Sequence, residues 1–144
     1  MMKSYFEYRH TVGFAETNLV GNVYFTNYLS WQGRCREMFL LENVPDVLEE
    51  LQRGLALVTV RVSCEFLNEL VAFDAVAVRM RLTAHAQNRA TMSFEYWRVN
   101  HNTEELVARG EQQVAAMRRQ GTGMAPTPFP PSMQAALINM AQSK

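Results

Sequence analysis

The stretch FAETNLVGNVYFTNYLSWQGRCRE, residues 14–37, contains a turn, a glycine and then a long segment of bulky residues. The turn AETNLVGN follows an expected strand over residues 5–14. From Tyr24 onward the bulky positions recur at intervals of three and four, which predicts a helix of about 18 residues with one stripe against a sheet. That stripe comprises Tyr24, Asn27, Tyr28, Trp31, Cys35, Met38, Phe39 and Glu42.

Composition narrows the class of protein. The chain has 144 residues, with acidic and basic side chains in equal number. This length predicts one domain over residues 1–144, and the neutral balance argues against nucleic acid or an acidic membrane as partner. Because neither a signal-peptide pattern nor a run of about 18 apolar residues occurs, we expect a cytoplasmic protein. Cys35 and Cys64 lack metal-ligand spacing and are expected to be reduced, packed thiols.

The rest of the chain is expected to form mostly strands. Pro45 begins a short helical segment, PDVLEELQ, which Gly54 ends. Alternating patterns then predict strands over residues 54–69, 72–85, 90–100 and 105–119. The short turns LNEL, QNR and HNTE predict that these strands form an antiparallel meander in chain order. The first strand should place Ala56, Val58, Val60, Val62, Cys64 and Phe66 on one face and Leu57, Thr59, Arg61, Ser63 and Glu65 on the other.

These elements predict an α+β fold, in which an antiparallel five-stranded sheet wraps around a long central helix. Its core should span about residues 5–118, followed over residues 119–144 by an extended Pro-rich tail and a short helix capped by Ser132. One helix cannot cover both faces of the sheet, so we expect a second subunit to cover what is left.

The order of elements resembles the hot-dog fold. A motif in this chain resembles that of thioesterases of the 4-hydroxybenzoyl-coenzyme A type. It comprises Glu16-Thr17-Asn18, Gly21-Asn22-Val23-Tyr24, Asn27-Tyr28 and Arg36. Together with Trp-Gln-Gly-Arg-Cys-Arg-Glu, residues 31–37, they are most similar to the thioesterases encoded beside iterative polyketide synthases that make enediyne antibiotics. One departure matters, because Asn18 stands where the 4-hydroxybenzoyl-coenzyme A family carries its catalytic aspartate.

The resemblance implies a substrate, a partner and an assembly. The substrate would be a polyene β-keto acyl chain on an acyl carrier protein, released by hydrolysis with loss of carbon dioxide to give a methyl ketone. The assembly would be a homotetramer made of two dimers, with sites between protomers. No cofactor is implied.

Asn18 is the first candidate catalytic residue. An amide does not titrate, so it would position the attacking water or hold the thioester carbonyl; the alternative is a turn residue bonded to its own backbone. Free backbone N–H groups near Asn22, Val23 and Tyr24, at the expected start of the helix, would stabilise an oxyanion, and Gly21 would let the substrate approach.

Arg36 and Tyr28 are the other catalytic candidates. Arg36 would bind the thioester region or the β-keto carboxylate, or else form an ion pair with Glu37 or Glu42. Tyr28 would direct its hydroxyl into the site or pack in the core. On the following strand, Thr59 and Arg61 would form the second subunit's wall of the site or a plain interface.

Other titratable residues give weaker signals. Glu16 and Glu65 are the carboxylates that could replace the missing aspartate, although solvated surface explains both. His10, His85 and His101 lie far apart in turns or strands. No metal-ligand spacing, serine-hydrolase elbow or nucleotide loop occurs, which predicts hydrolysis without a cofactor.

Three other functions remain open from the sequence. Asn18 in place of aspartate also fits a non-catalytic acyl-binding module, in which the same groove holds a chain. A general acyl-coenzyme A thioesterase is a further alternative. A hot-dog dehydratase would use a histidine with an acidic partner, and the sequence places no histidine near the turn or on the helix.

Overall fold

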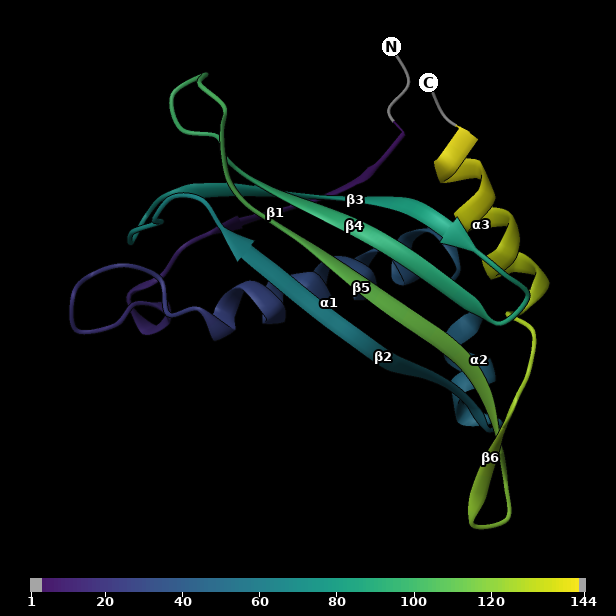
Figure 1. Cartoon of the computed structure of the whole chain (residues 1–144). Helices are drawn as coiled ribbons and strands as arrows, with labels where there is room; N and C mark the ends of the chain where they lie inside the picture. Colours follow the sequence, from purple (N-terminus) through teal and green to yellow (C-terminus); the bar gives the residue numbers. More distant parts are fainter. Residues whose placement is uncertain (1–3, 143–144) are drawn as a thin grey trace.

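The structure, a computed structural model, describes residues 4–142 (Figure 1). In chain order its elements are β1 (Phe6–Thr11), a 3₁₀ turn (Phe14–Glu16), α1 (Thr26–Asn43), α2 (Val47–Gln52), β2 (Leu55–Phe66), β3 (Ala75–His85), β4 (Arg89–Arg98), β5 (Glu105–Gln120), β6 (Gly123–Pro126) and α3 (Pro131–Gln142). The strands form one antiparallel sheet in the order β1-β3-β4-β5-β2, and β6 pairs with β5. The sheet lies over α1, which confirms the predicted α+β fold (Figure 1).

The predicted four-stranded meander is wrong in one step. Strands β3, β4 and β5 are joined by hairpins, as expected, but β2 pairs with β5 at the far edge of the sheet instead of with β3. Residues 67–74 therefore form a crossover past the ends of β5 and β4. Leu70 in this crossover has no exposed surface, so the segment LNEL is anchored in the core and is not a hairpin turn.

Strand β2 is irregular at its centre. Its pairing with β5 shifts at Val60, where one extra residue forms a bulge. Thr59 before the bulge and Phe66 after it both face α1: Thr59 Oγ1 accepts a 3.0 Å hydrogen bond from Arg36, and the Phe66 ring centre lies 4.9 Å from that of Tyr28. The alternation predicted along the whole strand is therefore wrong, because a bulge reverses which face each later residue takes.

Helix α1 buries Tyr28, Trp31, Gln32, Cys35, Phe39 and Leu40. This is most of the predicted stripe, but Tyr24 precedes the helix and is exposed, and Glu42 is exposed as well. Beyond residue 118, the limit expected for the core, the buried cluster takes in Phe129, Met133, Leu137 and Met140. The helix α3 begins at Pro131, and the Ser132 hydroxyl donates to Asp46 Oδ2 instead of capping the helix.

Candidate active site

The turn between β1 and α1 is held by backbone hydrogen bonds. The Asn18 N–H donates to Asn22 O at 2.9 Å, and the Gly21 N–H donates to Asn18 O at 3.0 Å. Gly21 has a φ of 95°, a conformation that a residue with a side chain rarely adopts, so glycine is required to close this turn. The loop then meets the crossover, where the Val23 N–H donates to Leu70 O at 2.8 Å.

The side chain of Asn18 has a defined orientation. Its Oδ1 accepts a 3.0 Å hydrogen bond from the Val20 N–H, the local turn contact that the sequence left as an alternative. This bond occupies the carbonyl end, whereas Nδ2 makes no hydrogen bond with any residue in 4–142. Asn18 lines a cavity, so the turn contact presents the amide as a hydrogen-bond donor.

Of the three backbone donors predicted near the start of α1, the Asn22 N–H has no acceptor among residues 4–142, and the other two are bonded within the chain. The N–H groups of Val23 and Tyr24 are occupied, because they donate to Leu70 O and Glu16 O at 2.8 Å each. The helix starts at Thr26, two residues later than expected, so its unpaired donors are displaced along the chain. Within residues 4–142, the N–H groups of Phe25, which lines the cavity described below, and of Thr26 have no acceptor.

A cavity of about 430 Å³ opens at this end of the molecule. Asn18, residues 22–25 and Tyr28 line one side, and residues 66–69 line the other. The turn, the start of α1 and the end of β2 therefore enclose one cavity. Five of the predicted site residues line it: Asn18, Asn22, Val23, Tyr24 and Tyr28. Gly21 shapes the turn without lining the cavity.

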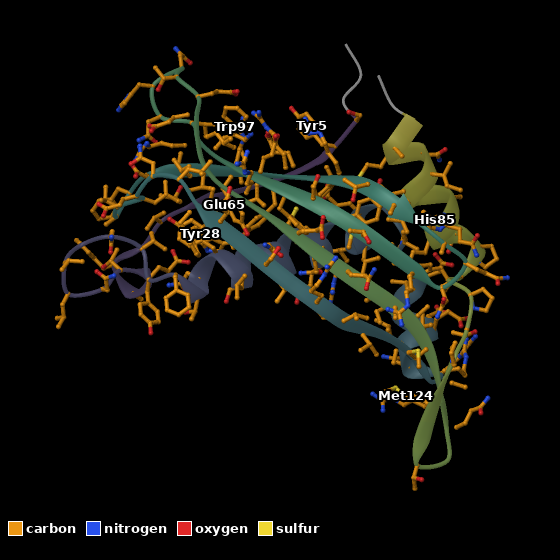
Figure 2. The ribbon with its side chains drawn as sticks, viewed as in Figure 1. Tyr5, Tyr28, Glu65, His85, Trp97 and Met124 are labelled. Carbon is orange, nitrogen blue, oxygen red and sulfur yellow. The ribbon has the colours of Figure 1, made fainter. Side chains whose placement is uncertain are left out.

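Tyr28 lies at the inner end of the cavity, where α1 begins and β2 finishes (Figure 2). Its ring is 3% exposed and contacts the rings of Phe66, Trp31 and Tyr96. Burial raises the pKa of its hydroxyl to about 12, so the group stays protonated at neutral pH. Tyr28 is thus both a core residue and a neutral hydroxyl at the cavity wall.

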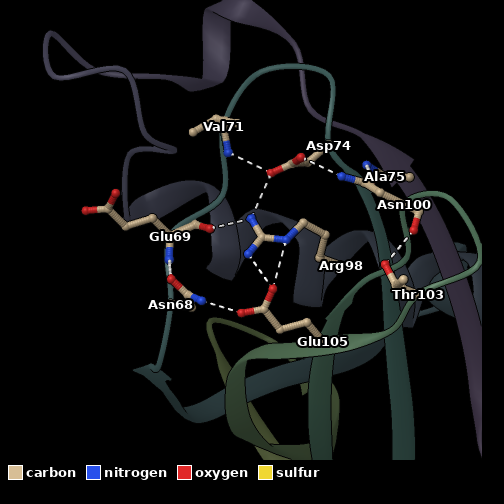
Figure 3. Close-up of polar contacts among 9 residues, drawn as sticks. All are labelled: Asn68, Glu69, Val71, Asp74, Ala75, Arg98, Asn100, Thr103 and Glu105. Atoms are coloured by element: carbon tan, nitrogen blue, oxygen red, sulfur yellow. Dashed lines mark hydrogen bonds and ion pairs between the residues drawn. The ribbon is translucent and has the colours of Figure 1, made fainter.

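Figure 3 shows how the crossover wall of the cavity is fixed. Arg98, at the end of β4, donates from Nη1 to Glu69 O at 2.9 Å and to Asp74 Oδ2 at 3.2 Å. Its Nη2 donates to Glu105 Oε1 at 2.6 Å, and Asn68 Nδ2 donates to the other oxygen of that carboxylate. One guanidinium therefore ties both ends of the crossover to the strands beside it.

Asp74 completes this network. It is 7% exposed and accepts hydrogen bonds from the Val71 N–H and from Asn100 Nδ2, at 2.9 and 2.8 Å. Burial alone would raise the pKa of its carboxyl, but these bonds and the Arg98 cation outweigh it and lower the pKa below its ordinary value. The crossover is thereby held by an ionised carboxylate at neutral pH.

Arg36 lies apart from the cavity within one chain. It follows Tyr28 by about two helical turns, a rise of about 12 Å. Its Nη1 donates to Thr59 Oγ1 at 3.0 Å and to Gln112 Oε1 at 2.8 Å, and burial lowers its pKa. Neither expected ion-pair partner binds it, since Glu37 pairs with Arg34. Arg36 is therefore a half-buried cation with neutral hydrogen-bond partners.

The bulge in β2 separates the two strand residues that the sequence grouped. Thr59 reaches Arg36, but Arg61 pairs with Glu111 at 2.8 Å. Because the neighbouring Gln112 faces α1, Glu111 and Arg61 must face the opposite side of the sheet. The expectation that Thr59 and Arg61 share one face of the site is wrong for this reason.

The carboxylates considered as a replacement base are occupied elsewhere. Glu16 accepts hydrogen bonds from the Gly13 N–H, His10 Nε2 and Trp31 Nε1, which outweigh the effect of burial and lower its pKa. Glu65 pairs with Arg109 on the outer face of the sheet (Figure 2). Sequence reasoning missed Glu69, the one carboxylate among the described residues lining the cavity.

His10 lies closer to the turn than the sequence indicated. Its Nε2 is 2.7 Å from a Glu16 oxygen, and its ring lies 5.1 Å from that of Trp31. The pair does not line the cavity. Burial raises the pKa of Cys35 to about 12 and that of Cys64 to about 11, as expected of reduced, packed thiols.

Residues 4–142 contain no group of three or more His, Cys, Asp or Glu side chains that could hold a metal ion. No helix among them is long and apolar enough to span a membrane.

Comparison with known proteins now assigns the family. The profile of the thioesterase-like superfamily matches residues 12–137, and the chain therefore belongs to this superfamily. It has the hot-dog fold and is a thioester hydrolase, as the sequence predicted. A search of curated protein sequences finds no match.

Solved structures agree with this assignment. The dynemicin thioesterase, crystallised in a study of induced fit and allostery on polyene binding, is 48% identical, with a TM-score of 0.91 over 94% of this chain and 96% of that one. A 1,4-dihydroxy-2-naphthoyl-CoA thioesterase from Synechocystis is 21% identical, with a TM-score of 0.82 over 94% and 96% of the two chains. A mutant of 4-hydroxybenzoyl-CoA thioesterase, with asparagine for aspartate and complexed with 4-hydroxybenzoyl-CoA, is 14% identical, with a TM-score of 0.82 over 93% and 99%. The last two show the shared fold.

Proposed function

We propose that the chain hydrolyses a polyene β-keto acyl thioester from the acyl carrier protein of an iterative enediyne polyketide synthase. The observation that carries this proposal is Asn18 in the wall of an aromatic cavity, with its Oδ1 bonded to the Val20 N–H and its Nδ2 left without a partner among residues 4–142. Similarity to the dynemicin thioesterase, at 48% identity, supports a polyene as the acyl chain. The carrier partner and the later decarboxylation are what the resemblance of the sequence motif to the enediyne thioesterases implies.

The chemistry uses fixed hydrogen bonds. Asn18 Nδ2 and the unpaired N–H group of Phe25 donate to the thioester oxygen while water attacks the carbonyl carbon. Each such donor is worth about 2.7–4 kcal/mol in comparable oxyanion sites, so two supply most of the roughly 8 kcal/mol that modest catalysis requires. The C–S bond then breaks, and the proton from water is transferred to the departing carrier thiolate.

Loss of carbon dioxide follows from the product. The β-keto carboxylate breaks its bond between the α-carbon and the carboxylate carbon, and the α-carbon takes up a proton to give the methyl ketone. Arg36 suits the β-keto oxygen, because its guanidinium is half-buried and has no carboxylate partner. In this role Arg36 stabilises the negative charge that develops on the β-keto oxygen.

A second copy of the chain completes the site. The outer edge of β2 pairs with no described strand, and Val60, Val62 and Phe66 on it are exposed by 45%, 39% and 48%. Long apolar edges of this kind are normally covered by another strand. Antiparallel pairing of two copies of β2 about a two-fold axis between Val62 and Ser63 would bring Thr59 of one copy opposite Phe66 of the other.

This arrangement joins the separated catalytic groups. Arg36 is bonded to Thr59, and the cavity with Asn18 adjoins Phe66. The Arg36 of one protomer therefore approaches the Asn18 cavity of its partner. A homotetramer made of two such dimers, as the family resemblance implies, keeps this pairing.

The test is product analysis with the natural type of substrate. An acyl carrier protein loaded with a polyene β-keto acyl chain is incubated with the purified chain, and the products are identified by mass spectrometry. We expect free carrier and the methyl ketone polyene, and about 10²–10³-fold slower formation of both with the Asn18→Ala variant.

Two results would assign another function. Hydrolysis of simple acyl-coenzyme A with an intact carrier thioester would indicate a general acyl-coenzyme A thioesterase. Inertness toward both thioesters, with tight retention of the loaded carrier, would indicate an acyl-binding module.

A further inference from the structure

Arg36 is held by a chain of buried amides that the reaction itself does not use. Gln112 Oε1 accepts the 2.8 Å hydrogen bond from Arg36 Nη1, and Gln112 Nε2 donates to Gln32 Oε1 at 3.4 Å. Gln32 Nε2 in turn donates to Ser63 O at 2.9 Å. Gln32 has no exposed surface and Gln112 is 4% exposed, so both amides lie inside the apolar core.

The neighbouring glycine shows that the sheet is shaped for this contact. A Cβ atom at Gly110 would lie 2.3 Å from Gln32 Nε2 and 2.5 Å from Ser63 O. Only a residue without a side chain leaves room for the Gln32 amide to reach the strand. Since buried amides destabilise a core unless their hydrogen bonds are made, two apolar residues would be the simpler choice here.

The amides hold Arg36 without forming an ion pair with it. A glutamate at position 112 would bind the guanidinium with the same geometry but would neutralise it. Around Arg36, the titratable group whose charge acts on it is Glu37 on α1, which pairs with Arg34. On β5, Gln112 is uncharged. A negatively charged group of a substrate would therefore bind an Arg36 guanidinium that has no ion-pair partner of its own.

We propose that Gln112, supported by Gln32, is a positioning residue that fixes the Arg36 guanidinium without neutralising it, so that Arg36 can bind the β-keto group of the substrate. The role of Gln112 rests on the proposed function of Arg36. Gln112 would affect both the orientation and the net charge of the Arg36 site, and a separate variant tests each effect.

The experiment compares four variants on two thioesters of equal length, one with and one without a β-keto group. Gln112→Glu keeps shape and hydrogen bond but adds a negative charge, and Gln112→Met keeps volume but provides no oxygen acceptor. Arg36→Met removes the cation. Gln113→Glu makes the same charge change one residue along β5, on the outer face of the sheet, where Gln113 contacts Arg89 and Thr91.

We expect Gln112→Glu to reproduce the loss seen in Arg36→Met, about 10- to 100-fold in kcat/KM on the β-keto thioester, the range of one charge-assisted hydrogen bond. The thioester without the β-keto group should be hydrolysed at the wild-type rate. Gln113→Glu should behave as wild type on both. A merely structural role for Gln112 would lower both rates together and would lower the thermal midpoint.

Each other outcome overturns one of the two ideas. If Gln112→Glu keeps wild-type rates while Arg36→Met loses activity, the positioning role is wrong and the function of Arg36 stands. If Arg36→Met slows both thioesters equally, recognition of the β-keto group by Arg36 is wrong, and the positioning role of Gln112 in that recognition is overturned with it. Should Gln112→Glu fail to fold, Gln112→Met, which adds no charge, must still lose about 10-fold on the β-keto thioester, or positioning is wrong.

Discussion

Replacing Asn18 with alanine tests the donor at the centre of the mechanism. The side chain makes one bond within the described chain, from the Val20 N–H to Oδ1, in an exposed loop. Losing it should lower the free energy of unfolding by about 1 kcal/mol or less. Losing the free Nδ2 donor should instead raise the reaction barrier by about 2.7–4 kcal/mol, a decrease in turnover of about 10²–10³-fold.

The assay is single-turnover hydrolysis of a saturating carrier thioester, with unfolding in urea measured on the same preparations. Asn68→Ala is the matched control, because it also removes an amide from the cavity wall. Its Nδ2 is already bonded to Glu105, so this variant deletes no free donor and should lose less than about threefold in turnover.

Asn18→Asp separates a donor from a base. Aspartate keeps the oxygen that accepts from Val20 but replaces the NH₂ group with a second oxygen. We expect it to be as slow as the alanine variant at neutral pH. An aspartate variant faster than the wild-type chain, or an alanine variant with unchanged turnover, would refute the donor role.

Three further predictions concern pH and assembly. With no carboxylate base, the single-turnover rate should be nearly flat from about pH 5.5 to 8; an ionisation that disappears in a glutamine variant of Glu16, Glu65 or Glu69 would identify a base. Because the folded pKa of Asp74 is depressed, its stabilisation is complete above the unfolded pKa of about 3.9 and is lost as pH falls through the folded value; Asp74→Asn should therefore reduce the loss of unfolding free energy between pH 6 and 3 in urea titrations. Val62→Arg, on the exposed β2 edge, should give an inactive monomer by light scattering, and an active dimer would contradict the proposed interface.

The fold could be predicted where local patterns decide it. Intervals of three and four along α1, and hairpin turns on both sides of β4, indicated the long helix and three neighbouring strands. The crossover could not be predicted, because a short polar segment such as LNEL is compatible with a tight turn. Only burial of Leu70 and the Val23–Leu70 hydrogen bond distinguish a crossover from a turn, and both are tertiary.

The candidate site, like the fold, could be predicted from the sequence only in part. Asn18 and Tyr28 were found by motif and share the cavity, whereas Glu69 was missed because it lies on the misassigned crossover. Arg61 was misplaced because the bulge at Val60 has no signature in a run of alternating valines. One signal was overlooked: Gln32 precedes Arg36 by one helical turn, so a buried amide beside the cation could have been expected.

A site shared between protomers makes a quantitative prediction about mixed dimers. On the β-keto thioester, Asn18→Ala and Arg36→Met chains should each keep about a tenth or less of wild-type activity as homodimers. In a mixed dimer, one site combines both defects, and the other combines an intact Asn18 with an intact Arg36. Random assembly after co-expression in equal amounts makes half of the dimers mixed, each with one working site of two, so about a quarter of the wild-type activity should return.

If Asn18 and Arg36 of the same chain served one site, every site in the mixture would carry a defect, and no activity would return. Their separation by about two turns of α1 within the chain favours recovery, since a rise of about 12 Å exceeds the distance from a thioester carbonyl to its β-keto oxygen.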